Sequence, residues 1–327
     1  MSRVAIIEVD ENAAREGHYD AMQFDVLMVM GKCQPADDFG PCGLNCLLDR
    51  LASTGIVIVR DDDAKAIGML EEADRHHVSY GTSADSEFGA IMVDQTGGMS
   101  TLMLSAGDTS VMVETPLCGL GMASNLAATA AMGVLLGHSL NDVAKHVVTL
   151  RSIPGRGQRL VNFGQATVVI ETGGAIDRVA ESLRTAKATG AGGRVWCVLA
   201  VGENDCEDTL ASFGQTIERF AHHCVVTSQP NQSGSFLKRS HHVLDGVREC
   251  AAIRLVADQN KAIQWAVETA RPRDTIVWIT NRSNQTAYQA RTEIDALAAF
   301  VEQTRSQREE TDVSVAPSID LGTPFSL

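Results

Sequence analysis

The chain has 327 residues, enough for two domains of ordinary size, and its 44% apolar and 21% charged residues favour packed globular domains over disorder. Its formal net charge of −14 argues against a protein that binds nucleic acid mainly through a basic face. No apolar run reaches the roughly 20 residues of a spanning helix, and the N-terminal run meets acidic residues at once, so we expect neither membrane insertion nor a signal peptide. Eight irregularly spaced cysteines without a CxxC pair favour reduced thiols, a cytoplasmic location and no metal site.

The first half of the chain shows an α/β pattern followed by short β runs. Apolar runs at residues 24–30 and 56–59 have the length of buried parallel strands. Turn residues separate three further runs that predict an antiparallel meander appended to this α/β domain: 88–93, 101–104 and 110–114. Helical spacing predicts helices at 44–52, 64–75, 124–136 and 140–150. Ser139, with an acid three residues on, is predicted to cap the last of these helices.

After Pro154, strand and helix patterns alternate. The predicted strands are 166–171, 194–200, 223–227, 252–256 and 275–280. The predicted helices are 175–188, 208–221, 238–248, 260–270 and 287–307. Strands that alternate with helices imply a doubly wound, mostly parallel sheet. From residue 308 the chain is polar and then contains proline, so we expect a mobile tail.

Several motifs are similar to those of the Mur ligase family. The family's Glu-Val-Ser-Ser-His and the Phe-Asp-Val that follows it are similar to Glu8-Val9 and residues 24–26. Its glycine turn before an alanine-rich helix is similar to residues 119–128, and its Pro-Gly-Arg-Met-Glu is similar to residues 154–158. The sequence therefore resembles this family, most closely the branch that adds the third residue to the UDP-N-acetylmuramoyl peptide.

The resemblance runs from residue 7 to residue 289 and implies the domain organisation. Residues 1–152 are expected to form a truncated central, ATPase-like domain without its phosphate loop, with a parallel sheet, helices and the small meander. Residues 153–307 are expected to form the C-terminal, doubly wound domain, followed by the tail at 308–327. Such ligases use ATP and Mg²⁺ to convert a carboxylate into an acyl phosphate, which the amine of an amino acid then attacks.

Many positions that carry this chemistry in the family are substituted here. No Gly-Lys-Ser/Thr phosphate loop occurs in these 327 residues. The family's metal-binding Asp-His-Leu-Asp aligns with residues 35–38 (Pro-Ala-Asp-Asp), and no lysine lies between Lys32 and Lys65 to supply the family's metal-bridging lysine. The arginine that holds the amino-acid carboxylate in the family is Gln232. We therefore expect no catalytic residue and no metal ligand.

Four residues remain as candidates for vestigial ligand contacts. Glu8 matches a metal-contacting acid of the family, and a solvated acid at a strand end is the alternative. Asn125 is expected to cap the start of the alanine-rich helix. Arg156 matches an arginine near the phosphates, against the alternative of an interdomain salt bridge or cap. Glu171 is an acid at the carboxyl end of a strand, where ligands bind in this architecture.

The resemblance and its departures lead to two hypotheses on function. The first is a non-catalytic Mur ligase paralogue, a pseudoenzyme that binds or scaffolds in cell-wall precursor synthesis, with no cofactor expected although the family uses ATP and Mg²⁺. The alternative is an ATP-dependent amide ligase that a partner subunit completes in trans. In either case we expect a protein partner or self-association to cover the truncated central domain, with no nucleic acid bound.

Overall fold

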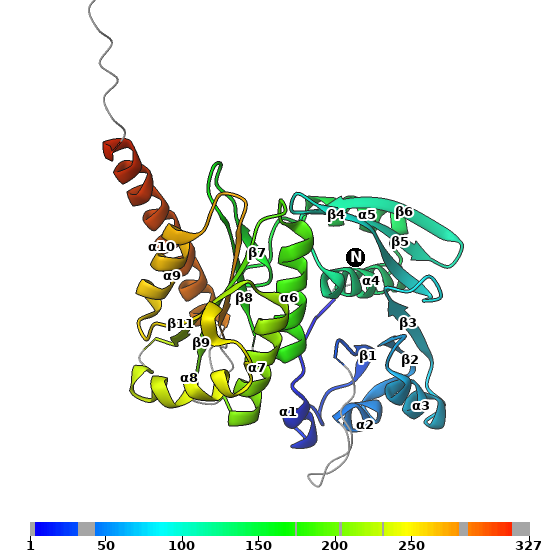
Figure 1. The fold of residues 1–327 in the computed structure, drawn as a ribbon. Helices are drawn as coiled ribbons and strands as arrows, with labels where there is room; N and C mark the ends of the chain where they lie inside the picture. The colour runs from blue at the N-terminus through cyan, green and yellow to red at the C-terminus, as the bar shows by residue number, and fades with distance from the viewer. Residues whose placement is uncertain are drawn as a thin grey trace, which may run out of the picture. The chain divides into compact units, whose positions relative to one another are not determined.

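The computed structural model describes residues 4–31, 43–173, 175–202, 205–230, 232–280 and 287–315. The chain divides into two compact units (Figure 1). The first unit contains residues 1–95 and 99–151, and the second contains residues 96–98 and 152–327. Each unit is built around a six-stranded sheet.

The sheet of the first unit has its strands in chain order. These are β1 (Phe24–Met28), β2 (Leu51–Arg60), β3 (His77–Gly81), β4 (Phe88–Thr96), β5 (Met99–Ala106) and β6 (Thr109–Thr115). Parallel pairing joins β1 to β4, whereas β5 and β6 pair antiparallel. The predicted meander therefore continues the parallel sheet, as the prediction of an appended meander anticipated. The link is β3, which the sequence did not predict because it lacks a continuous apolar run.

Helices cover both faces of the first sheet. They are α1 (Glu11–Arg15), α2 (Gly43–Leu48), α3 (Ala64–Glu72), α4 (Leu120–Leu135) and α5 (Leu140–Thr149). One apolar core joins α4 and α5 to the sheet, and a second joins α2 and α3 to the other face of β2. The predicted cap of α5 is confirmed, because the Ser139 side chain accepts a hydrogen bond from the Asp142 N–H.

The sheet of the second unit has the order β11-β10-β9-β12-β8-β7. Its strands are β7 (Gln158–Leu160), β8 (Thr167–Thr172), β9 (Val195–Val201), β10 (His223–Ser228), β11 (Ile253–Leu255) and β12 (Thr275–Thr280). All five predicted strands are present and pair parallel, which confirms the doubly wound architecture. The antiparallel edge strand β7 was not predicted, since three residues are too few to show a pattern.

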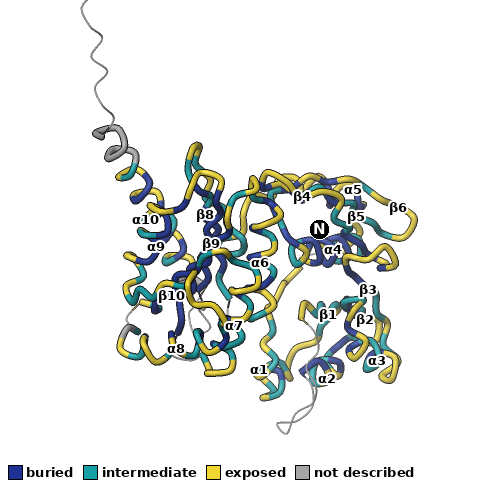
Figure 2. The backbone as a smooth tube through the Cα atoms, in the orientation of Figure 1, coloured by how far each residue is buried: buried dark blue, intermediate teal, exposed yellow. Residues whose placement is uncertain are grey.

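The helices of the second unit divide between the two faces of this sheet. They are α6 (Ile176–Thr189), α7 (Glu207–Phe220), α8 (Phe236–Asp245), α9 (Gln259–Thr269) and α10 (Ala287–Val315), with short 3₁₀ turns at Ser233–Ser235 and Cys250–Ala252. One core lies under α6, α7 and α8, and the other under α9 and α10. Strands β9 and β12 are buried along their whole length, as Figure 2 shows for the centre of this unit.

Helix α10 corrects one expectation about the end of the chain. It continues to Val315, so residues 308–315, which we expected to belong to a mobile tail, are helical. The rest of that segment, residues 316–327, lies outside the described residues. None of the helices in the described part of the chain is long and apolar enough to cross a membrane.

Candidate functional site

The carboxyl ends of the parallel strands in the second sheet lie at one edge, and Glu171 lies at that edge. Strands β10, β9, β12 and β8 run in the same direction, with β12 paired between β9 and β8. Glu171 is the last residue but one of β8. In open sheets of this kind, ligands bind outside the carboxyl ends of the strands.

The Glu171 carboxylate is buried among three nitrogen groups. The residue is 5% exposed, and its Oε2 accepts a hydrogen bond of 2.8 Å from the Gly157 N–H. Its Oε1 lies 3.6 Å from Nη1 of Arg178 and 3.9 Å from Nη1 of Arg156. The same Nη1 of Arg156 donates to the Thr172 carbonyl oxygen at 2.7 Å. These contacts place one buried acid near two cations, which partly offset the cost of burying its charge.

Burial controls the ionisation of this carboxyl group. It raises the pKa of Glu171 to about 7, because removing a carboxylate from water disfavours its charged form. The Gly157 N–H, the charge of Arg156 and a hydrogen bond from the Ser182 side chain act in the opposite direction, and the charge of Glu181 raises the pKa further. Glu171 is therefore present in both protonation states near neutral pH.

Glycine at position 173 leaves space for the side chains of both arginines. Gly173 has a φ of +147°, a conformation that residues with a Cβ rarely adopt. A Cβ at this position would lie 2.8 Å from Cδ of Arg178 and 3.4 Å from Nη1 of Arg156. The absence of a side chain at Gly173 therefore leaves room for both guanidinium groups at the end of β8.

The structure brings together two of the four predicted site residues, Arg156 and Glu171. It adds Arg178, which the sequence analysis did not select. Arg178 lies in the first turn of α6, directly after the strand that carries Glu171. The predicted helix at 175–188 already placed this residue next to the strand end, so a signal for it was available.

The other two candidates, Glu8 and Asn125, lie in the first unit. Glu8 is exposed in the irregular segment before α1. Asn125 is exposed on α4, and the expectation that it caps this helix is wrong. The helix begins at Leu120, and its N-cap is Gly119, with a φ of 103° and no side-chain cap. The Gly119 N–H donates instead to the Gln95 side chain at 2.7 Å.

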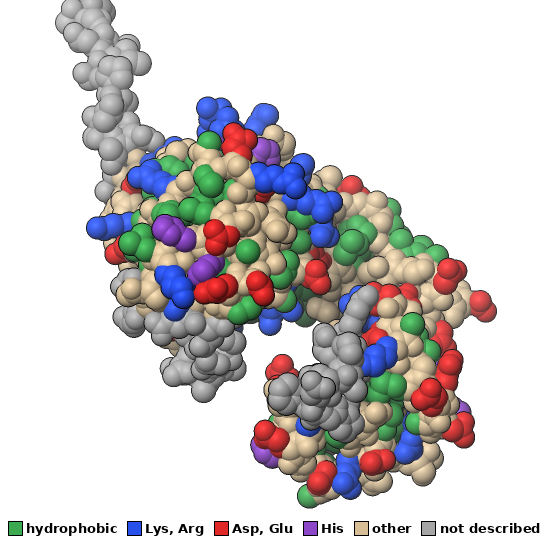
Figure 3. Space-filling view, turned by 60° about the horizontal axis from the view of Figure 1, so that its bottom comes forward, with side chains coloured by type: hydrophobic (Ala, Val, Ile, Leu, Met, Phe, Trp, Pro, Cys, Tyr) green, Lys and Arg blue, Asp and Glu red, His purple; other side chains and the backbone are tan. Residues whose placement is uncertain are grey.

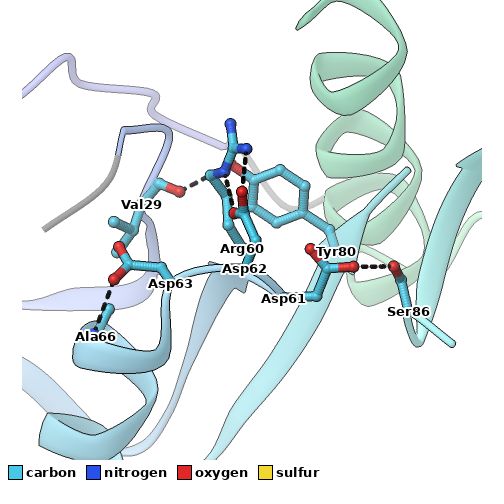
Figure 4. Close-up of polar contacts among 8 residues, drawn as sticks. All are labelled: Val29, Arg60, Asp61, Asp62, Asp63, Ala66, Tyr80 and Ser86. Atoms are coloured by element: carbon cyan, nitrogen blue, oxygen red, sulfur yellow. Dashed lines mark hydrogen bonds and ion pairs between the residues drawn. The ribbon is translucent and has the colours of Figure 1, made fainter. Parts of the chain in front are cut away.

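The first unit has its own group of polar side chains at the carboxyl end of β2. Asp62 pairs with Arg60 through two hydrogen bonds of 2.8 and 2.9 Å, and Asp63 caps α3 at the Ala66 N–H (Figure 4). Asp61 accepts a hydrogen bond from the Ser86 hydroxyl. Each acid of this run therefore has a structural partner, and Tyr80 donates to the Val29 carbonyl beside them.

A cavity of about 520 Å³ lies next to these acids. It is lined by Arg60, Asp61, Asp62, Thr82, Ser83, Asp85 and Ser124. Within the described ranges, no group of three His, Cys, Asp or Glu side chains is placed to hold a metal ion. Asp37 and Asp38, which align with the family's metal segment, lie outside those ranges.

The surface of the second unit mixes charge of both signs. On the face that Figure 3 shows, acidic, basic and apolar side chains are interspersed over this unit. The net negative charge of the chain is therefore not concentrated there in one patch.

Fold and site together define a doubly wound α/β protein with a candidate ligand site at the carboxyl edge of its second sheet. Residues 155–282, which include the whole of that site, match the model for the glutamate ligase domain of Mur ligases. This part of the chain therefore contains a domain that matches the Mur ligases, as residues 154–158 led us to expect.

Curated relatives support the same assignment at low identity. The UDP-N-acetylmuramoyl-L-alanyl-D-glutamate--2,6-diaminopimelate ligase of Acidovorax sp. (strain JS42) is 27% identical over 229 residues, covering 67% of this chain and 45% of the relative. The ligase of the same name from Ralstonia nicotianae is 24% identical over 295 residues, covering 84% of this chain and 57% of the relative. The chain therefore spans about half the length of the curated relatives it matches.

Solved structures show the same fold. MurF ligase from Thermotoga maritima in complex with ADP has a TM-score of 0.64 at 14% identity, covering 86% of this chain and 62% of that one. MurF from Acinetobacter baumannii has a TM-score of 0.62 at 17% identity, covering 83% and 60%.

The expectation that no cofactor is used is contradicted by these findings. The relatives are Mur ligases, which use ATP and Mg²⁺, and one structural neighbour was solved with ADP. The expectation rested on the missing phosphate loop. The matched region covers 45% of the first of these relatives, so the missing loop was not sufficient ground for excluding a nucleotide.

Proposed function

We propose that this chain takes part in the synthesis of peptidoglycan precursors, as a Mur ligase relative that binds a pathway intermediate and does not complete the ligation by itself. The main support is that the matched ligase domain, residues 155–282, contains Arg156, Glu171 and Arg178 at one sheet edge. The relatives that match this region are named as ligases for a UDP-N-acetylmuramoyl dipeptide and 2,6-diaminopimelate.

The chemistry of Arg156, Glu171 and Arg178 suits the binding of an anion better than acyl activation. Two guanidinium groups match the oxygens of a carboxylate or phosphate, because charge-assisted hydrogen bonds to such groups are strong. By the family resemblance, however, the arginine that would hold the amino-acid carboxylate is Gln232. The loss of one positioned donor costs on the order of 10²- to 10³-fold in rate, so we expect little turnover from this chain alone.

ATP, the nucleotide that the family uses, matches the two arginines of this site through its phosphates, but among the described residues the site lacks a set of ligands for its Mg²⁺. The exposed sides of Arg156 and Arg178 could meet phosphate oxygens, and a bound nucleotide would supply the activated phosphoryl group. Within the described part of the chain, no matching set of metal ligands accompanies them. Mg²⁺ would therefore need ligands from the nucleotide, from water or from another protein segment.

A second candidate function is an ATP-dependent amide ligase completed in trans by a partner subunit. It is favoured by the length comparison, since the curated relatives are about twice as long as the part that matches. In this version the partner would carry the phosphate loop, and the present chain would supply the domain that holds the incoming amino acid.

Binding and turnover measurements on the purified chain separate these functions. We expect calorimetry to detect binding of UDP-N-acetylmuramoyl-L-alanyl-D-glutamate or 2,6-diaminopimelate, and we expect no phosphate release when both are added with Mg-ATP. Arg156→Gln should weaken binding about tenfold or more, because it removes a charge-assisted contact. Lys187→Gln, which removes an exposed cation elsewhere on α6, should leave it unchanged.

Two results would change the assignment. Phosphate release by the chain alone would show a self-sufficient ligase, and release only after addition of a native-cell extract would favour completion in trans. If neither compound binds, with Mg-ADP present or absent, the proposed function is wrong.

A further inference from the structure

The two arginines beside Glu171 are only partly engaged by it. Their Nη1 atoms lie 3.6 and 3.9 Å from the carboxylate, beyond hydrogen-bond distance, and their side chains are 43% and 40% exposed. Arg60, by contrast, donates two hydrogen bonds of 2.8 and 2.9 Å to the carboxylate of Asp62. The chain can thus form a close bidentate pair, but the pairs at Glu171 are long and leave donors of both guanidinium groups open to solvent.

Glu171 is surrounded by groups from each element that packs against it. The segment before β7 supplies Arg156 and the Gly157 N–H, while α6 supplies Arg178, Glu181 and the Ser182 hydroxyl. Within the described ranges, these two arginines and Glu181 are the charged side chains found facing it. An incoming anion at the arginines would add a second negative charge beside a carboxylate that is already buried.

A buried carboxylate responds to such a charge by taking up a proton, because neutralisation costs less than keeping two like charges in a site of low polarity. The proton comes from solvent and binds to a carboxylate oxygen of Glu171, and no covalent bond of the ligand changes. Once Glu171 is protonated, it no longer presents a negative charge to the two guanidinium groups. Gly173 leaves the space over both side chains free of a Cβ.

We propose that Arg156 and Arg178 form a binding site for an anionic group of the ligand, and that Glu171 is their resident counter-ion, which takes up a proton when that group binds. This inference rests on the proposed function, since it concerns the same edge of the second sheet, and it names the ligand chemistry as carboxylate or phosphate.

The affinity for anions should then depend on pH. The pKa of Glu171 is raised to about 7, so the protonated form dominates about one pH unit below this value and is a minor form about one unit above it. An apparent dissociation constant scales inversely with the fraction of the competent form. We therefore expect anions to bind about tenfold more tightly near pH 6 than near pH 8.

Calorimetry with two simple anions, on the full chain, tests the expected pH dependence of anion binding. Sulfate does not titrate in this range and stands in for phosphate, and glutarate stands in for a carboxylate ligand. At about pH 7, titrations in two buffers of different ionisation enthalpy should show uptake of about half a proton per anion. Glu171→Gln should bind near pH 8 as tightly as the unmodified chain binds near pH 6, with no dependence on pH.

Matched variants identify the groups responsible. Asp177→Asn removes an exposed charge from the same turn of α6 and should keep the pH dependence of the unmodified chain. Arg156→Gln and Arg178→Gln should each weaken anion binding about tenfold or more, because each removes a charge-assisted contact. Circular dichroism of each variant shows whether it is folded.

Several outcomes would overturn the inference. These are a constant affinity across the pH range, a pH dependence that survives in Glu171→Gln, unchanged binding in either arginine variant, or no binding of either anion at millimolar concentration. If the muropeptide still binds in any of these cases, the proposed function stands and only the counter-ion role fails. If an anion binds with proton uptake but no muropeptide or amino acid binds, the proposed function fails instead.

Discussion

At the scale of single residues, Glu171 should make the stability of the protein depend on pH in an unusual direction. Its pKa is raised from 4.5 to about 7, so between these values the folded state holds more protons than the unfolded state. Stability therefore falls as pH rises through this window, opposite to the usual effect of a salt-bridged acid. We expect Glu171→Gln to raise the free energy of unfolding near pH 8 by about 1–3 kcal/mol, and to change it little near pH 5.

Urea denaturation of both proteins at the two pH values checks this prediction. Asp177→Asn serves as the control, since it removes an exposed charge on the neighbouring helix. An equal effect of Glu171→Gln at both pH values would show that the carboxylate is not destabilised by burial.

The sequence identified part of this residue-scale arrangement. Glu171 and Arg156 were selected because one follows a predicted strand and the other belongs to a family motif, and both lie in the site. Arg178 was missed although its position in the helix was predicted, because a lone arginine in a helix usually faces solvent. Asn125 was assigned a wrong role, since the turn at Gly119 starts its helix one turn earlier than the apolar pattern indicates.

At the scale of elements, α7 and α8 pack so closely that glycine is required between them. A Cβ built at Gly214 of α7 would collide with the Val243 carbonyl oxygen of α8 and would also meet Val247. A backbone atom cannot move aside as a flexible side chain can. We expect Gly214→Ala to destabilise the protein by about 1–3 kcal/mol, the usual cost of overpacking.

Gly68 offers the opposite case within the same chain. It lies inside α3, and a Cβ at this position would meet nothing within 4 Å. Gly68→Ala should therefore stabilise the protein by about 0.5–1 kcal/mol, because alanine favours the helix. The urea midpoints of the two variants provide the measurement. If Gly68→Ala loses stability as Gly214→Ala does, the loss at Gly214 cannot be assigned to the collision of its Cβ with α8.

Strands were predicted most accurately from the sequence where every residue of the strand is buried. Strand β12 was predicted at its observed bounds, 275–280, because it is buried on both faces and reads as an apolar run. Strands β3 and β7 were missed since one mixes polar and apolar residues and the other is three residues long. Tertiary pairing, which a local pattern does not contain, places both in their sheets.

At the scale of the whole molecule, the family resemblance supplied what local patterns could not. Alternating strands and helices indicated a doubly wound second half, but periodicity alone does not give strand order or bring Arg156 next to Glu171. Local patterns do not reveal contacts between residues that are far apart in the sequence. The Arg305 side chain of α10, for example, donates a hydrogen bond to the Leu160 carbonyl oxygen, 145 residues earlier in the chain. Arg305 is 1% exposed, and its guanidinium also donates to the Ala166 carbonyl, so it ties α10 to the β7–β8 connection.

The division into two units leads to a prediction about unfolding. Each apolar core has its members within one unit: two cores belong to the first and two to the second. Separate cores favour separate cooperative transitions. The three tryptophans, Trp196, Trp265 and Trp278, all belong to the second unit, so their fluorescence reports on that unit alone, whereas far-ultraviolet circular dichroism reports on both.

Leu102 and Leu183 provide a matched pair of fully buried leucines, one in each unit. We expect Leu102→Ala to cost about 2–5 kcal/mol and to move part of the dichroism transition to lower urea while the tryptophan midpoint stays in place. Leu183→Ala should move the tryptophan midpoint, because it opens a cavity in the core of the second unit. If both probes shift together in the Leu102→Ala protein, the two units unfold as one, and the separate cores do not define independent folding units.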